Sequence, residues 1–447
     1  MAACAGARCE TVRMALPRVV IIGCGFGGLA AVRALAQAPV DVTLIDRTNH
    51  HLFQPLLYQV ATAGLSAPAV AAPVRHILRR QMRSGRLTVL QAEAHRVDVG
   101  GHRVLLEDGS ALPYEHLIVA AGAINSWFGH DDWARHAPAL KTLADALAIR
   151  ARVIGAFERA ERCSDPAERQ TWLNFVVIGG GPTGVELAGT LVEIARHTLP
   201  GEFRHIDSRQ ARVCLVEGAE RLLGAFDPES SASAAAQLQR LGVELLTSAR
   251  VTAIDDGGVT LQTVQGEQRL AARTVLWAAG VAASPLGRQI AADCGLQADR
   301  AGRVPVLPDL SLQGHPEISV IGDIATAFSK GQPVPGVSPA AKQMGRRAAH
   351  NLLARLQGRS TRAFIYADYG SLATLGRKAA VVQLPLGRLG TLRLSGYAAW
   401  LFWLFAHVYF LIGFRNRLMV LTDWAWNYWT FARHARVVAQ AEAAPRP

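Results

Sequence analysis

Short apolar runs that end in glycine recur along the chain and predict buried strands. Residues 19–22 form one such run, and a helical pattern follows it to about Gln37. Residues 40–45 then alternate hydrophobic and polar side chains, which is typical of a second strand. A strand, a helix and a strand in this order predict parallel pairing.

The same pattern returns after residue 170. Residues 175–178 predict a strand, residues 183 to about 196 a helix, and residues 213–216 another strand. Each of the two units is followed by an apolar run that ends in Ala-Ala-Gly, at residues 117–122 and 275–280. Duplication of one nucleotide-binding architecture explains this pattern better than a repeat array does.

The C-terminal part of the chain has a different pattern. Residues 396–414 carry no charge, and a helix of this length would measure about 28 Å, close to the hydrocarbon thickness of a bilayer. Residues 418–431 place polar side chains at helical spacing among aromatic ones, as in an amphipathic helix at an interface.

Three interpretations of these C-terminal helices stay open: attachment to one leaflet, a transmembrane span, and a buried core or dimer helix. Arginines flank the apolar run on both sides, so a single span would have to export one basic flank. One-leaflet attachment is therefore favoured. Trp424, Trp426 and Trp429 are expected at the lipid interface, and the surrounding arginines, Arg433 among them, are expected to hold anionic headgroups.

Composition narrows the class of protein. The 447 residues are 50% hydrophobic and 18% charged, which excludes a disordered chain and a collagen-like one and predicts several domains. The net charge of +12 fits an anionic partner without choosing among nucleic acid, membrane and a phosphate-bearing cofactor. Six cysteines without a Cys-x-x-Cys pair fit a reducing cytoplasm, no secretory signal is expected, and Met14 is an alternative start.

Residues 23–28 fit the pattern Gly-x-Gly-x-x-Gly between a strand and a helix. The first glycine permits a tight turn, the second lets the backbone approach a pyrophosphate, and the third lets helix and strand pack closely. The helix N-terminus adds free N–H groups and a positive dipole end. Asp46 ends the next strand, where a carboxylate can accept hydrogen bonds from a ribose. A plain glycine-rich turn is the alternative.

Residues 179–184 repeat this fingerprint, and Glu217 ends the strand that follows. The long interval before Glu217 predicts an extension over about residues 196–210. A glutamate here favours NADH, because a 2′-phosphate would meet like charge; Arg221 lies nearby and opposes this. Two such units suggest two nucleotides, FAD held permanently and NADH exchanging. Asp323, after the strand expected at residues 318–321, can bind the ribitol of a flavin.

Glu186 has two interpretations. An acid in the first turn of a helix is favourable for structural reasons alone. Alternatively, Glu186 lies near the nicotinamide or flavin ring.

Six segments of the chain resemble a known protein family. They are VIIGCGFGGL (20–29), HLFQPLLYQVA (51–61), VIGGGPTGVELA (177–188), LWAAGV (276–281), VIGD (320–323) and AAKQMG (340–345). The chain resembles the type II (non-proton-pumping, single-subunit) NADH:quinone oxidoreductases over about residues 17–435. The segment 51–61 is the most discriminating, because the glycine motifs occur throughout flavoprotein reductases.

The resemblance implies FAD in the first unit, NADH in the second, and monotopic attachment to the membrane. It also implies that Glu186 and Gln343 lie by the flavin on the quinone side, with Lys378 close to the isoalloxazine. There Glu186 would help to protonate a quinone oxygen, provided that burial raises its pKa. The family often has a glutamine four residues before Gln343, where this chain has Pro339.

The expected fold is α/β, with two Rossmann-like dinucleotide-binding domains and a C-terminal helical membrane-binding segment. The expected boundaries are 17–165 and 301–355 for the two parts of the FAD-binding domain, 170–300 for the NADH-binding domain and 360–447 for the membrane-binding region. The residues expected to bind the cofactors are Gly23, Gly25, Phe26, Gly27, Gly28, Asp46, Arg47, Ala121, Gly122, Gly179, Gly181, Pro182, Thr183, Gly184, Glu217, Gly280, Gly322 and Asp323. No metal site is predicted.

The sequence thus predicts transfer of hydride from NADH to FAD and of two electrons to a membrane quinone, without proton pumping. The enzyme would sit on the cytoplasmic face of the inner membrane, with a quinone and the lipid surface as partners and no nucleic acid; a homodimer is left open. The missing redox cysteine pair argues against a disulfide reductase and a sulfide:quinone oxidoreductase. Two rivals remain: a soluble NADH-dependent reductase of a small redox protein, and a non-catalytic flavoprotein partner.

Overall fold

The computed structural model describes residues 16–438, so the alternative start at Met14 lies outside the described residues. The chain divides into two compact units, and each unit is assembled from separate stretches of sequence. The first unit contains the chain up to Asn49, Leu78–Gly122 and Pro285–Tyr366; the second contains the rest. The boundaries expected for the four sequence regions stay predictions.

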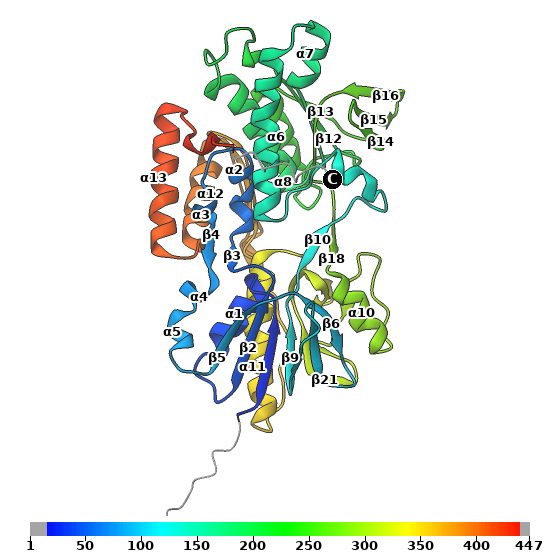
Figure 1. Cartoon of the computed structure of the whole chain (residues 1–447), viewed down its shortest axis with the longest axis vertical. Helices are drawn as coiled ribbons and strands as arrows, with labels where there is room; N and C mark the ends of the chain where they lie inside the picture. Colours follow the sequence, from blue (N-terminus) through cyan, green and yellow to red (C-terminus); the bar gives the residue numbers. More distant parts are fainter. Residues whose placement is uncertain (1–15, 439–447) are drawn as a thin grey trace, which may run out of the picture. The chain divides into compact units, whose positions relative to one another are not determined.

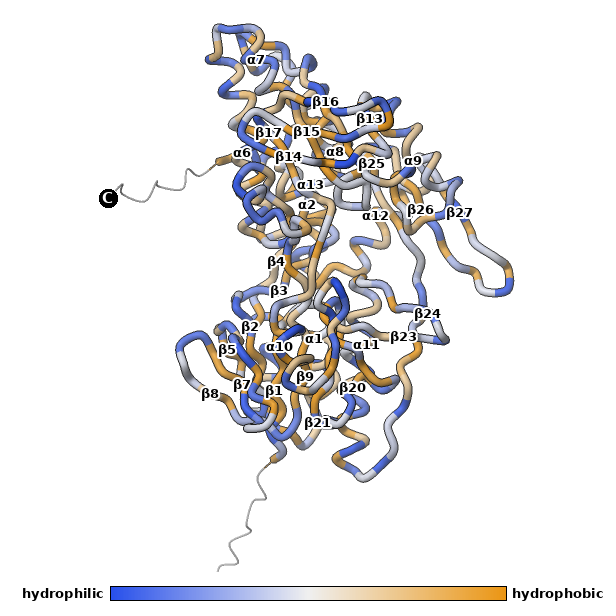
Figure 2. Tube along the Cα trace, turned by 90° about the vertical axis from the view of Figure 1, so that its right-hand side faces the viewer, coloured by the Kyte–Doolittle hydropathy of each residue, from blue (hydrophilic) through white to orange (hydrophobic). Residues whose placement is uncertain are grey.

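The first unit is built on a six-stranded sheet. Its strand order is β20 (Ser311–Leu312), β21 (His315–Val320), β9 (His116–Val119), β1 (Arg18–Ile22), β2 (Asp41–Asp46) and β5 (Leu87–Gln91). All neighbours pair in parallel except β20 and β21. The strand β1 is a hydrophobic segment in Figure 2, as expected of a strand buried on both faces.

Two helices, α1 (Phe26–Leu35) and α11 (Ser338–Leu356), pack against each other beside this sheet (Figure 1). Their close approach depends on glycine, because a Cβ on Gly345 would lie 2.1 Å from the carbonyl oxygen of Gly27. The other elements of this unit are α5 (Arg79–Met82), β6 (Ala94–Asp98), β7 (Arg103–Leu106), β8 (Ala111–Pro113), α10 (Pro285–Asp293), β19 (Val304–Pro305), η5 (Gly322–Ile324), β22 (Ala325–Thr326), β23 (Phe328–Ser329) and β24 (Gln332–Pro333).

The second unit repeats the plan with a four-stranded parallel sheet. Its strand order is β13 (Val243–Leu246), β12 (Arg212–Val216), β11 (Asn174–Ile178) and β17 (Thr274–Trp277). The helix α8 (Pro182–Glu193) follows β11 and continues into a π-helical turn at Ile194–Thr198. The α/β class, the parallel pairing and the position of each predicted strand in both units are therefore confirmed.

Three further layers complete the second unit. One is an antiparallel sheet of β25 (Ser371–Gly376), β26 (Ala379–Pro385) and β27 (Thr391–Ser395), and the second is formed by α12 (Gly396–Phe410) and α13 (Phe414–Thr430). The third is the antiparallel sheet of β14 (Arg250–Asp255), β15 (Gly258–Thr263) and β16 (Gly266–Ala271). The other elements are β3 (His50–Leu52), η1 (Gln54–Leu56), α2 (Leu57–Ala61), α3 (Ala67–Val70), β4 (Ala71–Pro73), α4 (Val74–Ile77), β10 (Ala123–Asn125), η2 (Asp131–Arg135), α6 (Leu143–Arg162), α7 (Pro166–Leu173), η4 (Ser208–Gln210), α9 (Pro228–Leu241), β18 (Val281–Ala283), η6 (Gly387–Leu389) and η7 (His434–Arg436).

The predicted 19-residue apolar helix is wrong in its length. The helix α12 ends at Phe410, where Leu411 adopts an extended conformation, and Gly413, with a φ of +89°, then leads the chain into α13. Its 15 residues measure about 22 Å. Among residues 16–438, no helix combines the length and the apolar character needed to cross a bilayer.

Candidate active site

The first glycine loop follows β1 in the first unit. Gly23 has a φ of +93°, and a Cβ there would lie 2.4 Å from the carbonyl oxygen of Ala120. A Cβ on Gly28 would lie 1.8 Å from the carbonyl oxygen of Gly23. The packing of the protein itself therefore requires glycine at these two positions.

Gly25 differs from both of these glycines. It is the N-cap of α1 with a negative φ, and a Cβ there would meet no described protein atom within 4 Å. Nothing in the fold requires glycine here, but open space at a helix N-terminus is what an approaching pyrophosphate needs. The residues present therefore fit a bound dinucleotide such as FAD.

The second glycine loop, between β11 and α8, repeats this geometry. Gly179 has a φ of +108°, and a Cβ on Gly184 would lie 1.7 Å from the carbonyl oxygen of Gly179. A Cβ on Gly181 would again meet no described atom within 4 Å. Pro182 and Thr183 begin the helix, where the fixed φ of proline suits the first helical position. This loop fits the pyrophosphate of NADH.

The two strand-end acids face their own glycine loops. The Oδ2 of Asp46 accepts a hydrogen bond of 2.6 Å from the backbone N–H of Cys24. In the second unit, the Oε2 of Glu217 accepts one of the same length from the N–H of Gly180. Each carboxylate is thereby fixed beside the loop, where it can also accept from a ribose. The Arg221 guanidinium instead donates to the carbonyl oxygens of Gly224 and Phe226 in its own loop and to the hydroxyl of Ser231 on α9.

The remaining residues that were predicted to bind the cofactors lie at the start of a helix or just after a strand. Phe26 and Gly27 open α1, and the ammonium of Lys342 lies 5.0 Å from the centroid of the Phe26 ring. The others follow the carboxyl ends of parallel strands, the edge of an α/β sheet at which ligands bind. They are Arg47 after β2, Ala121 and Gly122 after β9, Gly280 after β17, and Gly322 and Asp323 after β21.

Glu186 is a buried carboxyl in the second turn of α8. The first turn of this described helix contains no acid, so the interpretation of Glu186 as a first-turn acid is wrong. Burial raises the pKa of Glu186 well above its usual value, although the backbone N–H of Thr374 donates to it. Burial therefore favours the protonated form of this carboxyl.

A glycine lets this contact form. Gly189 lies three residues after Glu186 on α8, and a Cβ there would lie 1.8 Å from the carbonyl oxygen of Leu375. The strand β25 can therefore run directly against the helix, which places Thr374 beside the Glu186 carboxyl.

The buried acid predicts a pH dependence of stability. In the unfolded chain Glu186 ionises near its usual pKa of about 4.3, whereas the folded protein keeps the proton. The contribution of Glu186 to stability is thus fully present below that pH and is lost as pH rises toward the folded pKa. Glu186→Gln is expected to gain stability over the native protein by up to about 1.4 kcal/mol per pH unit.

Denaturation of both proteins at about pH 5 and about pH 8 measures this difference. A stability difference that does not change with pH would contradict the protonated state of Glu186. Glu217→Gln is the control, since it replaces a glutamate at a strand end in the same unit.

A cavity of about 600 Å³ lies within the second unit. Its volume is within the range of small-molecule sites. Most of its wall is aromatic and aliphatic and comes from the two C-terminal helices. The lining residues are Tyr58, Gln59, Gly64, Thr190, Glu193, Thr374, Gly376, Arg377, Tyr397, Trp400, Trp403, Leu404, Phe405, Val408, Leu421, Trp424, Ala425, Asn427, Tyr428 and Arg433.

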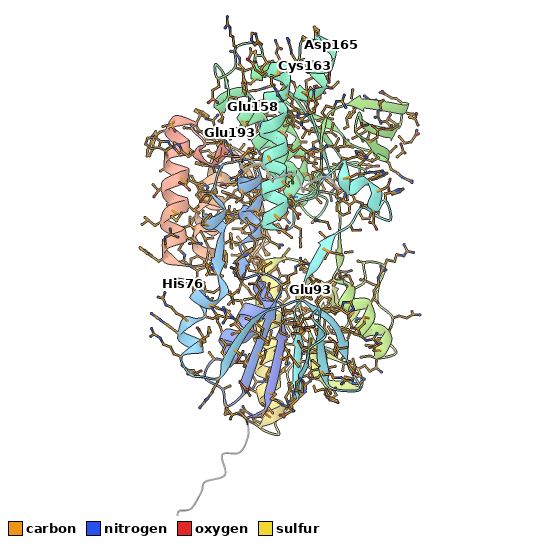
Figure 3. The ribbon with its side chains drawn as sticks, in the orientation of Figure 1. His76, Glu93, Glu158, Cys163, Asp165 and Glu193 are labelled. Atoms are coloured by element: carbon orange, nitrogen blue, oxygen red, sulfur yellow. The ribbon has the colours of Figure 1, made fainter. Side chains whose placement is uncertain are left out.

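Several polar residues of this cavity were missed by the sequence analysis. Tyr58 and Gln59 lie within the discriminating segment 51–61, so the signal was present, but these two residues were given no role. Arg433 was expected to hold lipid headgroups, but it is buried and pairs with Glu193 at 3.1 Å. Its guanidinium also donates to the carbonyl oxygen of Thr62. Glu193, which Figure 3 labels, ends α8.

Trp424 also departs from expectation. It was expected to face lipid together with Trp426 and Trp429, but only the latter two are exposed. The indole N–H of Trp424 instead donates to the side chain of Gln59 at 2.7 Å, and its ring packs on Trp403.

The two other predicted catalytic residues lie in different units. Lys378 is exposed in the turn between β25 and β26, with a φ of +61°, and its ammonium lies 5.5 Å from the ring centroid of Tyr428 in the cavity wall. Gln343 lies on α11 of the first unit, in the turn after Pro339. Their roles beside the flavin stay predictions.

Comparison with known proteins identifies the family. The model of the pyridine nucleotide-disulphide oxidoreductases matches residues 17–345, and that of the NDH2 C-terminal domain matches residues 369–434. The type II NADH:quinone oxidoreductase Ndh of Mycobacterium tuberculosis is 44% identical over 436 residues, which cover 96% of this chain and 92% of that protein. The chain belongs to the type II NADH:quinone oxidoreductases.

Other relatives of this type II oxidoreductase agree. The type II NADH:quinone oxidoreductase NdhA of Mycobacterium tuberculosis is 46% identical over 425 residues, 93% of this chain and 88% of that protein. The structure of NDH2 from Plasmodium falciparum in complex with NADH has the same fold, with a TM-score of 0.85 and 21% identity over 95% of this chain and all of that one. The predicted family, its enzyme class and its cofactors, FAD and NADH, are confirmed.

Proposed function

We propose that this chain oxidises NADH through FAD and reduces a membrane quinone on the cytoplasmic face of the inner membrane, without pumping protons. The observation that carries the proposal is the aromatic cavity between α8, β25 and the C-terminal helices. Its lining residues Tyr58 and Thr374 are neighbours of the buried Glu186 carboxyl, whose pKa is raised by burial. A planar quinone head can stack on the aromatic wall while polar groups at one end handle protons.

Different residues of the chain would bind the cofactors and handle protons. The loops at Gly25 and Gly181 would hold the pyrophosphates of FAD and NADH at two helix N-termini. FAD, when bound, supplies a ring that accepts a hydride from NADH and passes on two electrons. Glu186, held protonated by burial, would keep a proton near the site of quinone reduction.

The distribution of polar and apolar side chains on α12 and α13 supports a lipid-facing surface on these two helices. On α12 the exposed side chains include Leu401, Phe405 and Tyr409, whereas His407 is buried. In Figure 1 α12 and α13 stand side by side in orange and red. On α13 the apolar Phe414, Leu418, Leu421 and Trp429 are exposed, while Asn416 is buried. A helix that turns polar side chains inward and aromatic ones outward suits an apolar surrounding.

Replacing Phe414 and Trp429 together by glutamate is therefore expected to weaken binding to phospholipid vesicles at least about 100-fold. The two side chains are 82% and 76% exposed, and burying a large apolar side chain contributes about 1.5–3 kcal/mol. Co-sedimentation with vesicles measures the change. Val264→Glu is the matched control, because it adds a charge at a residue that is 90% exposed in the turn between β15 and β16. Equal loss in both variants would refute a specific lipid-facing role of the helices.

Flavin spectroscopy tests the function itself. Without oxygen, NADH is expected to bleach the bound flavin, and a short-chain quinone is expected to restore its colour. Flavin that NADH never bleaches would support the non-catalytic rival. Flavin that is bleached, but reoxidised only by a small redox protein, would support the soluble reductase.

A further inference from the structure

A chain of hydrogen bonds runs through the second unit from α13 to α2. The indole N–H of Trp424 donates to Oε1 of Gln59 at 2.7 Å, and Nε2 of Gln59 donates to the hydroxyl oxygen of Tyr58 at 2.9 Å. An indole nitrogen can only donate, so the Gln59 atom that faces Trp424 must be the oxygen. The amide nitrogen therefore faces Tyr58, and the phenol oxygen accepts.

This orientation leaves the phenolic hydrogen of Tyr58 directed away from Gln59. Tyr58 is 4% exposed, yet it lines the cavity. Burial raises the pKa of its hydroxyl well above the usual value, and the Glu186 carboxyl, whenever it is ionised, acts in the same direction. The phenol is therefore protonated at neutral pH.

The charged groups that face Tyr58 come from two elements. Glu186 and Glu193 belong to α8, and both raise the pKa of the phenol. Arg433, which follows α13, lowers it. Among the described residues, Tyr58 and Thr374 line the cavity whereas Glu186 does not. The phenol thus lies at the boundary between the cavity and the buried carboxyl.

We propose that Tyr58 is a catalytic residue of quinone reduction, which donates its phenolic proton to a quinone oxygen, and that Gln59 and Trp424 are positioning residues that orient it. This inference rests on the proposed function. As the quinone takes up two electrons that originate from NADH, the O–H bond of Tyr58 breaks and a new O–H bond forms on the quinone. The Glu186 carboxyl returns a proton to the phenolate and recovers its own from water, and water supplies the second proton of the quinol.

The test compares Tyr58→Phe with the native holoenzyme in separate half-reactions. Flavin reduction by NADH and reoxidation by ferricyanide, which takes electrons without protons, are expected to keep their native rates. Reoxidation by a short-chain quinone is expected to slow about 100-fold, which is typical of a lost general acid. The solvent deuterium isotope effect on that step should change, while the Kd for the quinone, read from tryptophan fluorescence, stays within about twofold.

Two further variants sharpen the result. Tyr114→Phe is the matched control, since it removes another buried phenol hydroxyl, in the first unit, and should leave every rate unchanged. Gln59→Met keeps the phenol but removes its orientation, and should slow quinone reduction about tenfold without affecting ferricyanide.

The outcomes separate this inference from the proposed function. If quinone fails to reoxidise the flavin of the native enzyme, both the proposed function and the inference about Tyr58 are refuted. If quinone reoxidises the native enzyme and Tyr58→Phe equally fast, the role of Tyr58 is refuted while the function stands. Equal slowing with quinone and ferricyanide would show that Tyr58 is only structural and would also overturn the inference.

Discussion

A Gly25→Val variant is expected to keep its fold and to lose its flavin. A Cβ at this position meets no described protein atom within 4 Å, so the empty chain has room for the side chain. That same space is where the pyrophosphate of FAD would approach the N-terminus of α1. We expect the ratio of flavin to protein after gel filtration to fall to a few per cent of the native value, with an unchanged circular dichroism spectrum.

The other glycines of the two loops provide controls. Gly181→Val is expected to retain flavin but to resist bleaching by NADH, since the second loop has the same open geometry. Gly28→Val is expected to misfold, because its Cβ would lie 1.8 Å from a carbonyl oxygen. A Gly25→Val protein that retains full flavin would contradict the placement of FAD in the first unit.

Loss of the buried arginine is expected to have the second large effect. Arg433→Met removes the partner of Glu193 and leaves that carboxylate, with 19% of its side chain exposed, without its ion pair. Removing one partner of a buried pair is far costlier than removing both, so we expect a loss of about 3 kcal/mol. Urea denaturation of the holoenzyme measures it. The double variant Arg433→Met with Glu193→Gln should recover most of the loss.

A neighbouring ion pair gives the matched control. Arg436 pairs with Glu202 in a more exposed setting, with 30% and 43% of the side chains accessible. Exposed pairs contribute little, so Arg436→Met should cost less than about 1 kcal/mol. Equal losses in the two single variants would mean that the pairing of Arg433 is no more important than a surface ion pair.

Local patterns explain why the nucleotide-binding units could be predicted. A buried strand, a glycine at positive φ and a helix lie within 18 residues around Gly23 and within 20 residues around Gly179, so a short stretch of sequence holds each whole arrangement. The positions of the two carboxylates could also be predicted. Asp46 ends β2 and Glu217 directly follows β12, and each of these strands pairs with the strand that precedes its glycine loop. In both units the observed strands begin or end within a few residues of the expected ones.

The cavity could not be predicted in the same way. Two residues of its wall, Gln59 and Trp424, are hydrogen-bonded although they are 365 positions apart in the sequence. A local sequence pattern cannot predict such a contact. The expectation for Trp424 was wrong for a related reason. Trp424, Trp426 and Trp429 were all expected at the lipid interface, but only Trp426 and Trp429 are exposed. Which face points inward depends on the surrounding medium and on tertiary partners, which the spacing does not contain.

The interleaved first unit constrains when the flavin can be acquired. The helices α1 and α11 of this unit pack closely through Gly27 and Gly345, which are 318 residues apart in sequence. At a synthesis rate of about 5–20 residues per second, the ribosome needs roughly 15–60 s between making the first helix and the second. During that interval β9 lacks its partner β21, and the nascent chain exposes an unpaired sheet edge. The helix that follows the first glycine loop therefore gains its packing partner only after most of the chain has been translated, and we expect flavin uptake to follow that point.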